Sequence, residues 1–577
     1  MAVSFQLAKL RLFDGTIIEP PLDGMTVFTG PNNSGKSVLL RELVTAIHHH
    51  PYGQEQQRYW VDSVEIHQSG ERDEVLAWLR GRGIEPRFQR STGRLMMPGQ
   101  SDHEAPNMDV EQFLAFWEAG RVNAISYLLL NDQWTEQRLG NQSDAQVWDQ
   151  SRPPSHPSQL LWEDKEAHQR FSKLFESSFG QPIAINRYIQ QIRLQIGSPG
   201  VEDTAPPASA QLREAYEALP LLQEQGDGMR AFTNILLHAL VRPAPIIVID
   251  EPEAFLHPPQ ARLLGRYLAL HTPSPCQVFV ATHSVDFLSG VMEGNSILRR
   301  TSPKGLSLAR ISRAGEEISA RNLTSADVTK LLDTPLLRYS NIVSGLFHDG
   351  VILCEAEGDC HFYAATIDAL RESGQHENLT LLHVNGKARL ADAAHKLRSC
   401  GIPTAIVADL DYLNDDAKIK EALKLLGGDW QDVSGDMSCL RENLSSSVTA
   451  RPAAEIKREI VRIIGNARGR ETLAKSQVDQ IAELMRTADG WKSLKVSGIT
   501  ALTGEAHGAV KRVLAYLARL GVFLVPVGEL ECWVREVPSG RKGAWLDRVF
   551  DDGHHERPSA ELRDFINAII RYSSAVR

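Results

Sequence analysis

The segment Gly30–Ser37 constrains the fold of this chain most narrowly, because its sequence Gly-Pro-Asn-Asn-Ser-Gly-Lys-Ser matches the pattern G-x-x-x-x-G-K-[ST]. The glycines of such a loop let successive backbone N–H groups turn inward and bind phosphate. Met25–Thr29 has the apolar pattern of a buried strand, and Val38–Ile47 predicts a helix whose N-terminus faces the anion. The segment therefore predicts a nucleotide-binding loop between a strand and a helix.

Each residue of this loop has an expected role in binding ATP and Mg²⁺. Lys36 supplies positive charge for the β- and γ-phosphates, and the Ser37 hydroxyl is placed to hold the metal ion. The other residues expected to contact the nucleotide are Gly30, Asn32, Asn33, Ser34 and Gly35.

A strand that ends in acidic residues follows at Pro245–Glu253. Four consecutive apolar residues precede Asp250 and Glu251, which predicts a buried parallel strand that delivers both carboxylates to its C-terminal end. We expect Asp250 to hold Mg²⁺ through water and Glu251 to orient the attacking water, although a helix cap is the simpler alternative. His283 ends a further buried strand, where it could sense the γ-phosphate or serve only in a turn.

Between the loop and the acidic strand, an apolar helix opens with two glycines, Gly226 and Gly228. The chain resembles the ATP-binding-cassette head of SMC- and RecF-type ATPases, because it has the phosphate loop, the glycine pair, the acidic strand and the histidine in that order. The resemblance implies a homodimer or higher homo-oligomer through the heads, in which this glycine signature closes on ATP bound to the other subunit. Gln225 replaces the usual leading serine, and the segment before the signature is too short for a long coiled coil.

Two buried strands in the second half of the chain also end in acidic residues. Glu355 ends the first, with Asp359 four residues on, and Asp409 and Asp411 end the second. Because residues two apart lie on one face of a strand, we expect that pair to project together. If the strands are neighbours in a parallel sheet, all four carboxylates converge and need cations to offset their repulsion. Helix caps and solvent-facing strand ends are the alternative.

Oxygen ligands of this kind suit Mg²⁺ or Mn²⁺, and two such ions would clamp the attacking and leaving oxygens of a phosphodiester. The block resembles the Toprim domain of topoisomerases, primases and certain nucleases, whose pattern is a strand, Glu-Gly, an acid and then D-x-D. Ala356 stands where glycine is usual. A second registration uses Glu357 and Gly358 instead, with His361 in place of the acid, and we prefer the first.

An ABC-type head followed by a Toprim domain resembles the OLD (overcoming lysogenization defect) nucleases. These include the nuclease subunit of the Gabija anti-phage system and effectors encoded beside reverse transcriptases. The resemblance implies a nucleotide-regulated, metal-dependent DNA endonuclease in bacterial anti-phage defence. It also implies an accessory partner, such as a helicase or a reverse transcriptase with its nucleic acid.

The OLD resemblance further implies a last strand followed by a glutamate and a lysine. Gly521–Leu530 fits the strand, Glu531 fits the glutamate as a metal ligand, and Lys542 fits the lysine. Such a lysine would neutralise the scissile phosphate or the charge that develops on it. Surface charge is the alternative for both residues.

We therefore expect an α/β protein with two domains. An ABC-type ATPase domain, a mixed sheet with helices, covers residues 1–320 and contains an inserted region at about 50–210. A helical connector, 321–346, leads to a parallel-sheet Toprim domain, 347–577, with a helical insertion at about 413–505. Within that insertion, the basic stretch Arg451–Lys475 predicts a DNA-backbone surface, and a solvated helix face is an equal alternative.

Composition excludes several other classes. No apolar run reaches the roughly 18 residues of a membrane span, and six cysteines without a C-x-x-C pair predict a reduced, cytoplasmic protein. With a formal net charge of −10, DNA binding requires locally concentrated basic groups. Two other functions stay open: a non-cutting RecF/SMC-like DNA-repair ATPase that clamps DNA, and a topoisomerase or primase.

Overall fold

The computed structural model shows two compact units, Met1–Thr334 and Pro335–Arg577. It describes residues 3–574 except 53–57, 83, 90–91, 98–107, 141–143, 149–153, 155, 203–206, 242–243, 299–303, 315–316, 324–340, 372–377, 385, 447–452, 466–471, 486–489 and 539–541. The helix expected at Ser325–Leu332 lies outside these ranges. Within them, no helix combines the length and the hydropathy that crossing a bilayer requires.

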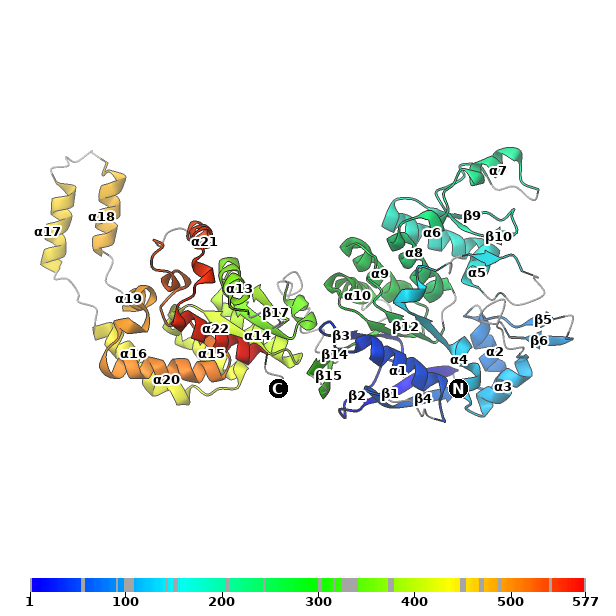
Figure 1. Cartoon of the computed structure of the whole chain (residues 1–577), viewed down its shortest axis with the longest axis horizontal. Helices are drawn as coiled ribbons and strands as arrows, with labels where there is room; N and C mark the ends of the chain where they lie inside the picture. The colour runs from blue at the N-terminus through cyan, green and yellow to red at the C-terminus, as the bar shows by residue number, and fades with distance from the viewer. Residues whose placement is uncertain are drawn as a thin grey trace. The chain divides into compact units, whose positions relative to one another are not determined.

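A six-stranded sheet in the order β15-β14-β3-β13-β12-β7 forms the centre of the first unit (Figure 1). All neighbouring strands run parallel except β14 and β15. Strands β12 and β13 are wholly buried, because helices cover both faces of a parallel sheet. The bounds are β3 Gly24–Thr29, β7 Leu130–Gln133, β12 Ile246–Asp250, β13 Gln277–Ala281, β14 Gly305–Ala314 and β15 Glu317–Leu323.

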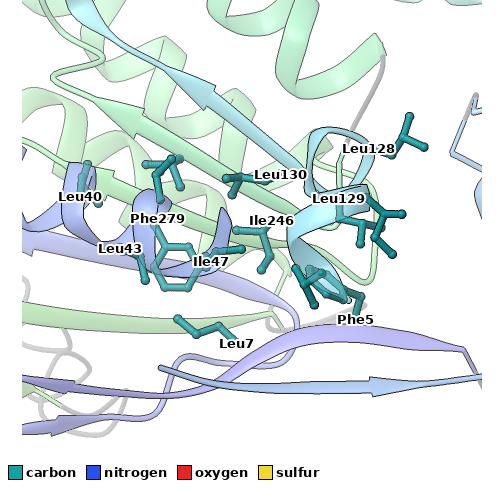
Figure 2. Close-up of a cluster of buried hydrophobic side chains, with 14 of the residues drawn as sticks. Phe5, Leu7, Leu40, Leu43, Ile47, Leu128, Leu129, Leu130, Ile246 and Phe279 are labelled. Carbon is teal, nitrogen blue, oxygen red and sulfur yellow. The ribbon is translucent and has the colours of Figure 1, made fainter. Parts of the chain in front are cut away.

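An antiparallel sheet in the order β2-β1-β4 joins this parallel sheet through helix α1, Lys36–His48. Figure 2 shows Leu43 and Ile47 of α1 in one cluster with Phe279 of β13 and Leu7 of β1. The apolar positions of α1 fall at helical spacing, so one face of the helix is buried in this core. The bounds are β1 Ser4–Leu12, β2 Ile17–Ile18 and β4 Val61–Ser69.

The sequence predicts one helix over 110–127 and one over 161–179 in the inserted region of the first unit, and the structure differs from both predictions. The single helix expected over 110–127 is two, α3 Val110–Glu118 and α4 Val122–Leu129, and β7 follows α4 directly. The helix expected over 161–179 is also two, because the Asp164 side chain accepts hydrogen bonds from the backbone of 166 and 167 and begins a new helix. The other elements are α2 Arg72–Arg80, β5 Arg87–Gln89, β6 Arg94–Met96, β8 Ala145–Gln146, α5 Pro157–Glu163, α6 Lys165–Phe179, β9 Ile183–Ile185, β10 Gln191–Ile192, β11 Leu194–Ile196 and α7 Ala210–Glu217.

A parallel four-stranded sheet in the order β17-β16-β18-β19 forms the second unit. Helices α13, α21 and α22 cover one face with a continuous apolar cluster that includes Phe362, Trp545 and Ile566. The strands are β16 Gly350–Cys354, β17 Leu379–His383, β18 Thr404–Ala408 and β19 Val522–Leu524. The helices of this core are α13 Glu357–Leu370, α14 Leu390–Ser399, α20 Gly504–Arg519, α21 Lys542–Asp551 and α22 Ala560–Ser573.

Among the described residues of the insertion between β18 and α20, five α-helices follow one another. Helices α17 and α18 lie side by side (Figure 1). Of the basic residues expected to contact DNA, Lys457, Arg458 and Arg462 are exposed on α17, whereas Arg451, Arg468 and Arg470 lie outside the described residues. The DNA-binding role of this stretch stays a prediction. The bounds are α15 Asp416–Leu426, α16 Gln431–Ser446, α17 Ala453–Ile464, α18 Lys475–Met485 and α19 Gly490–Ser497.

Two helices of the first unit, α9 Pro258–His271 and α10 Val285–Leu298, approach each other closely at glycines. A Cβ atom added at Gly290 would lie 1.9 Å from the carbonyl oxygen of Arg262. A Cβ atom at Gly265 would lie 2.3 Å from that of Phe287. Both distances are far shorter than van der Waals contact, so only glycine permits this packing.

We expect Gly290→Ala to lower the free energy of unfolding of the first unit by about 1–3 kcal/mol, because the added methyl group forces the helices apart. Urea unfolding followed by circular dichroism measures the change. Gly435→Ala on α16 is the matched control, because nothing lies within 4 Å of its added Cβ; it should be neutral or stabilising by roughly 0.5–1 kcal/mol. Equal unfolding midpoints for Gly290→Ala and the unaltered protein would contradict this account.

Candidate nucleotide and metal sites

The predicted phosphate loop lies between β3 and α1, at the C-terminal edge of the large sheet. Asn33 and Gly35 have left-handed backbones, with φ of 62° and 91°. The Lys36 ammonium folds back on the loop and donates to the carbonyl oxygens of Gly30 at 3.0 Å and Pro31 at 2.7 Å. Burial lowers the pKa of Lys36, and the acidic residues at the end of β12 oppose that effect. The loop therefore presents a buried cation beside a turn of backbone amides.

Ser37 and Asp250, the pair expected to hold Mg²⁺, are in contact. The Ser37 hydroxyl donates to Asp250 Oδ1 over 2.9 Å. Burial raises the pKa of Asp250, the hydrogen bond from Ser37 opposes this, and the charge of Glu251 adds to it. A hydroxyl and a buried carboxylate at the edge of a parallel sheet fit a divalent ion bound with nucleotide.

Glu251 and His283 also lie together, and Glu253 contacts both the ring and the backbone N–H of His283. His283 Nδ1 is 3.6 Å from Glu251 Oε1 and 3.3 Å from Glu253 Oε1. Glu253 Oε1 accepts hydrogen bonds from the Thr282 hydroxyl at 2.8 Å and from the His283 backbone N–H at 2.9 Å. Sequence analysis did not select Glu253, whose signal was only a third acid after Asp250 and Glu251.

Arg138 is a second residue that sequence analysis missed. Its side chain is fully buried and donates to the carbonyl oxygens of Glu251 at 2.6 Å and Gln133 at 3.2 Å. The Arg138 carbonyl accepts a hydrogen bond from Asn234 of helix α8, Asp227–Leu236. Burial lowers the pKa of Arg138 to about 10. Arg138 therefore connects the signature helix to the backbone of Glu251, which has a left-handed φ of 47°.

Helix α8 places the glycine signature at its N-terminus. Gly226 is the exposed N-cap residue, and a Cβ atom at Gly228 would lie 2.8 Å from the carbonyl oxygen of Phe255. Gly228 therefore allows this turn to pack against the segment that follows β12. The expected contact of Gly226 and Gly228 with ATP of a second subunit stays a prediction.

Three of the four carboxylates predicted in the second unit converge. Glu355, Asp409 and Asp411 each offer an oxygen within 4.8 Å of the others, and all three are half-buried. Glu355 follows β16 and Asp409 follows β18, which are neighbouring parallel strands. The Asp409 backbone N–H donates to Glu355 Oε1 over 3.3 Å. Their convergence gives an all-oxygen donor set that fits Mg²⁺ or Mn²⁺.

The path of the D-x-D segment differs from its prediction. Strand β18 ends at Ala408, and Asp411 lies in the 3₁₀ turn Leu410–Asn414, so the two aspartates do not share a strand face. The turn still brings both side chains toward Glu355. Burial raises the pKa of Glu355, the positive charge of Lys387 opposes this, and Asp411 adds to it.

Asp359 lies outside this triad, and its expected role as a metal ligand stays a prediction. It is buried in the first turn of α13, and its Oδ2 accepts a hydrogen bond from the Ala356 backbone N–H over 3.0 Å. This is the helix-capping alternative left open by the sequence. Asp359 is nevertheless near enough to contribute to the raised pKa of Glu355.

Three further charged residues border the triad. Lys387 Nζ lies 2.8 Å from Asp411 Oδ1, and Lys495 Nζ lies 3.3 Å from Glu529 Oε2. Glu529 reaches this cluster from the turn after β19, whereas Glu531 lies two residues on in the 3₁₀ helix Leu530–Trp533. Lys542 is the first residue of α21 and its side chain lies outside the described part of the chain. The roles of Glu531 and Lys542 stay predictions.

We expect Glu253→Ala to lower the turnover number for ATP by roughly 10²-fold with little change in KM, because His283 loses its fixed position. Glu253→Gln keeps the hydrogen-bond acceptor and should recover part of the turnover. Steady-state ATPase kinetics measure both, with the exposed Glu317→Ala as control. A change in KM alone, or no difference between the alanine and glutamine variants, would contradict the positioning role.

Comparisons with known proteins match two separate segments of the chain. Residues 142–289 match the model described as "AAA domain, putative AbiEii toxin, Type IV TA system". Residues 346–411 match "Overcoming lysogenization defect protein-like, TOPRIM domain". The Old nuclease of Escherichia phage P2 is 29% identical over 177 residues, which is 30% of this chain and 28% of that protein. The match thus spans little more than a quarter of this relative.

Solved structures similar to this chain include SMC heads. The Smc head bound to the C-winged helix domain of ScpA has 13% identity and a TM-score of 0.34, covering 56% of this chain and 99% of that one. The SMC head domain from Thermotoga maritima has 14% identity and a TM-score of 0.25, with the same coverage. At such low TM-scores, the fold assignment rests on the strand order and on the family models. A segment that matches an AAA domain, a later segment that matches an OLD-like Toprim domain and the partial similarity to an Old nuclease together support the assignment of this chain as an OLD-family nuclease.

Proposed function

We propose that this protein is a nucleotide-regulated DNA endonuclease that hydrolyses phosphodiesters with Mg²⁺ or Mn²⁺. The observation that supports this most directly is the convergence of Glu355, Asp409 and Asp411 at the C-terminal edge of β16 and β18. These residues lie within, or at the end of, the segment that matches the OLD-like Toprim model. DNA is the proposed substrate class.

The three carboxylates would hold one or two divalent ions. Such an ion, when bound, supplies positive charge that activates water and neutralises a phosphate oxygen. The chain itself adds two ammonium groups, because Lys387 and Lys495 both contact Asp411. These lysines balance the carboxylates and place hydrogen-bond donors where a DNA phosphate would approach.

The first unit is proposed to regulate cleavage by binding ATP with Mg²⁺. Two contacts support this: Lys36 lies against the predicted phosphate loop, and the Ser37 hydroxyl donates to Asp250. A homodimer or higher homo-oligomer would form through the ATPase units, because the exposed N-terminus of α8 would complete the ATP site of a second copy. Arg138 would then transmit the state of α8 to Glu251 through its hydrogen bonds.

We further propose that the protein acts in the cytoplasm in anti-phage defence, together with an accessory helicase or reverse transcriptase. This part of the proposal is supported only by the resemblance to OLD nucleases. Phage plating on cells that carry the gene, compared with cells carrying the Asp409→Ala/Asp411→Ala variant, tests it. Equal plating on both for every phage in a broad panel would contradict a defence role for the nuclease.

The double variant Asp409→Ala/Asp411→Ala should reduce plasmid cleavage in Mg²⁺ or Mn²⁺ below detection, because it removes two of three metal ligands. Agarose-gel assays across metal concentrations measure nicked and linear products. Asp551→Ala/Asp552→Ala removes two exposed carboxylates of the same unit and is the matched control. Full cleavage by the Asp409→Ala/Asp411→Ala protein would overturn the nuclease assignment.

Lys36→Met should abolish ATP binding and make the cleavage rate independent of ATP, while the nucleotide-free cleavage rate stays unchanged. The unaltered protein should cut at different rates with and without ATP. The rates of plasmid cleavage by both proteins are measured without ATP and with about 1 mM ATP, which is at the upper end of typical KM values. The alternative, a DNA clamp of the RecF or SMC kind, instead predicts ATPase activity stimulated by DNA and no strand breaks.

A further inference from the structure

Lys495 reaches the acidic cluster from the helical insertion rather than from the sheet. Its Nζ lies 4.0 Å from Asp409 Oδ2, 3.7 Å from Asp411 Oδ2 and 3.3 Å from Glu529 Oε2. The residue belongs to α19, which the chain reaches only after the four preceding helices of the insertion. One ammonium group thus contacts three carboxylates that come from two different strand ends.

The backbone around Lys495 is fixed by tight packing. Leu494 beside it is fully buried. A Cβ atom at Gly528 would lie 1.9 Å from the Lys495 carbonyl oxygen. Residue 528 in the turn after β19 must therefore be glycine for the turn to pack this closely against α19. The Ile499 backbone N–H donates to the Pro526 carbonyl oxygen over 2.9 Å and ties the end of α19 to the same turn. This packing fixes the backbone from which the Lys495 side chain extends to the carboxylates.

The carboxylates of the cluster outnumber its ammonium groups. Four carboxylates (Glu355, Asp409, Asp411 and Glu529) face two ammonium groups (Lys387 and Lys495), which leaves a net charge of 2 − 4 = −2. A fifth nearby carboxylate, Asp359, accepts a hydrogen bond at the N-terminus of α13, where the helix dipole offsets part of its charge. One divalent ion therefore offsets most of the negative charge of the cluster, and a second would leave it positively charged.

We propose that Lys495 is a built-in cation that takes the place of a second divalent ion, so that the cluster binds one ion and the insertion controls metal loading. This inference rests on the proposed nuclease function. A second ion would need the oxygens of Asp409, Asp411 and Glu529 that Lys495 contacts. The lysine supplies positive charge at that position permanently and without a metal requirement.

The prediction is one Mn²⁺ ion bound to the second unit of the full-length chain in the absence of nucleotide. Isothermal titration calorimetry and electron paramagnetic resonance of unbound Mn²⁺ count the ions. Lys495→Met should admit a second ion and tighten the first by about tenfold or more, because a positive charge within a few ångströms is lost. Lys495→Arg keeps the charge and should bind a single ion, as should the exposed control Lys424→Met.

Lys495→Gln is a second neutral variant in case the methionine protein fails to fold, and thermal unfolding checks both. Two ions of similar affinity in the unaltered protein, or no gain of an ion in either neutral variant, would overturn the role of Lys495. Plasmid cleavage by a protein that binds two ions would leave the nuclease proposal intact. Mn²⁺ binding that is absent, or unaffected by Asp409→Ala/Asp411→Ala, would instead overturn the metal site itself.

Discussion

Repulsion between carboxylates at the ends of parallel strands is the constraint on which both units of this protein depend. Parallel strands bring their C-terminal ends to one edge, so acids that follow neighbouring strands are forced together. In the first unit, Lys36 and Arg138 are buried cations that interact electrostatically with Asp250, Glu251 and Glu253. In the second unit, Lys387 and Lys495 contact the acids directly. Each unit thus offsets the charge of its acidic edge with cations from its own chain.

The cations come from different levels of the fold, and this decides what the sequence could reveal. Lys36 belongs to the same short loop as the glycines around it, so a local pattern identified it. Arg138 and Lys495 reach their acids from distant segments, and no spacing in the chain marks them. The same holds for Glu253, whose function becomes visible only when β13 places Thr282 and His283 beside it. Local motifs were therefore predictable, whereas the residues that orient them depend on packing.

Errors in the predicted elements have the same physical origin. A run of apolar residues at helical spacing predicted one helix over 161–179, but a single Asp164 side chain that caps backbone N–H groups was enough to begin a new one. Asp409 and Asp411 were expected to share a strand face, and a 3₁₀ turn brings them to Glu355 by another path. The four-stranded parallel sheet was predictable because its buried strands are apolar throughout. The sequence could not decide between helix capping and metal binding for Asp359, because both use the same residue types.

The position of the insertion explains why it can supply a charge to the acidic cluster. Strands β18 and β19 are parallel neighbours, so the chain must cross over between them, and α20 alone would suffice for that connection. The additional helices instead leave the sheet immediately after Asp409 and Asp411, at the edge where the carboxylates gather. They return through α19, whose Lys495 packs against the turn that carries Glu529. An insertion that begins and ends at the acidic edge can present side chains there without altering the sheet, so the charge around the carboxylates can change while the four-stranded core keeps its fold.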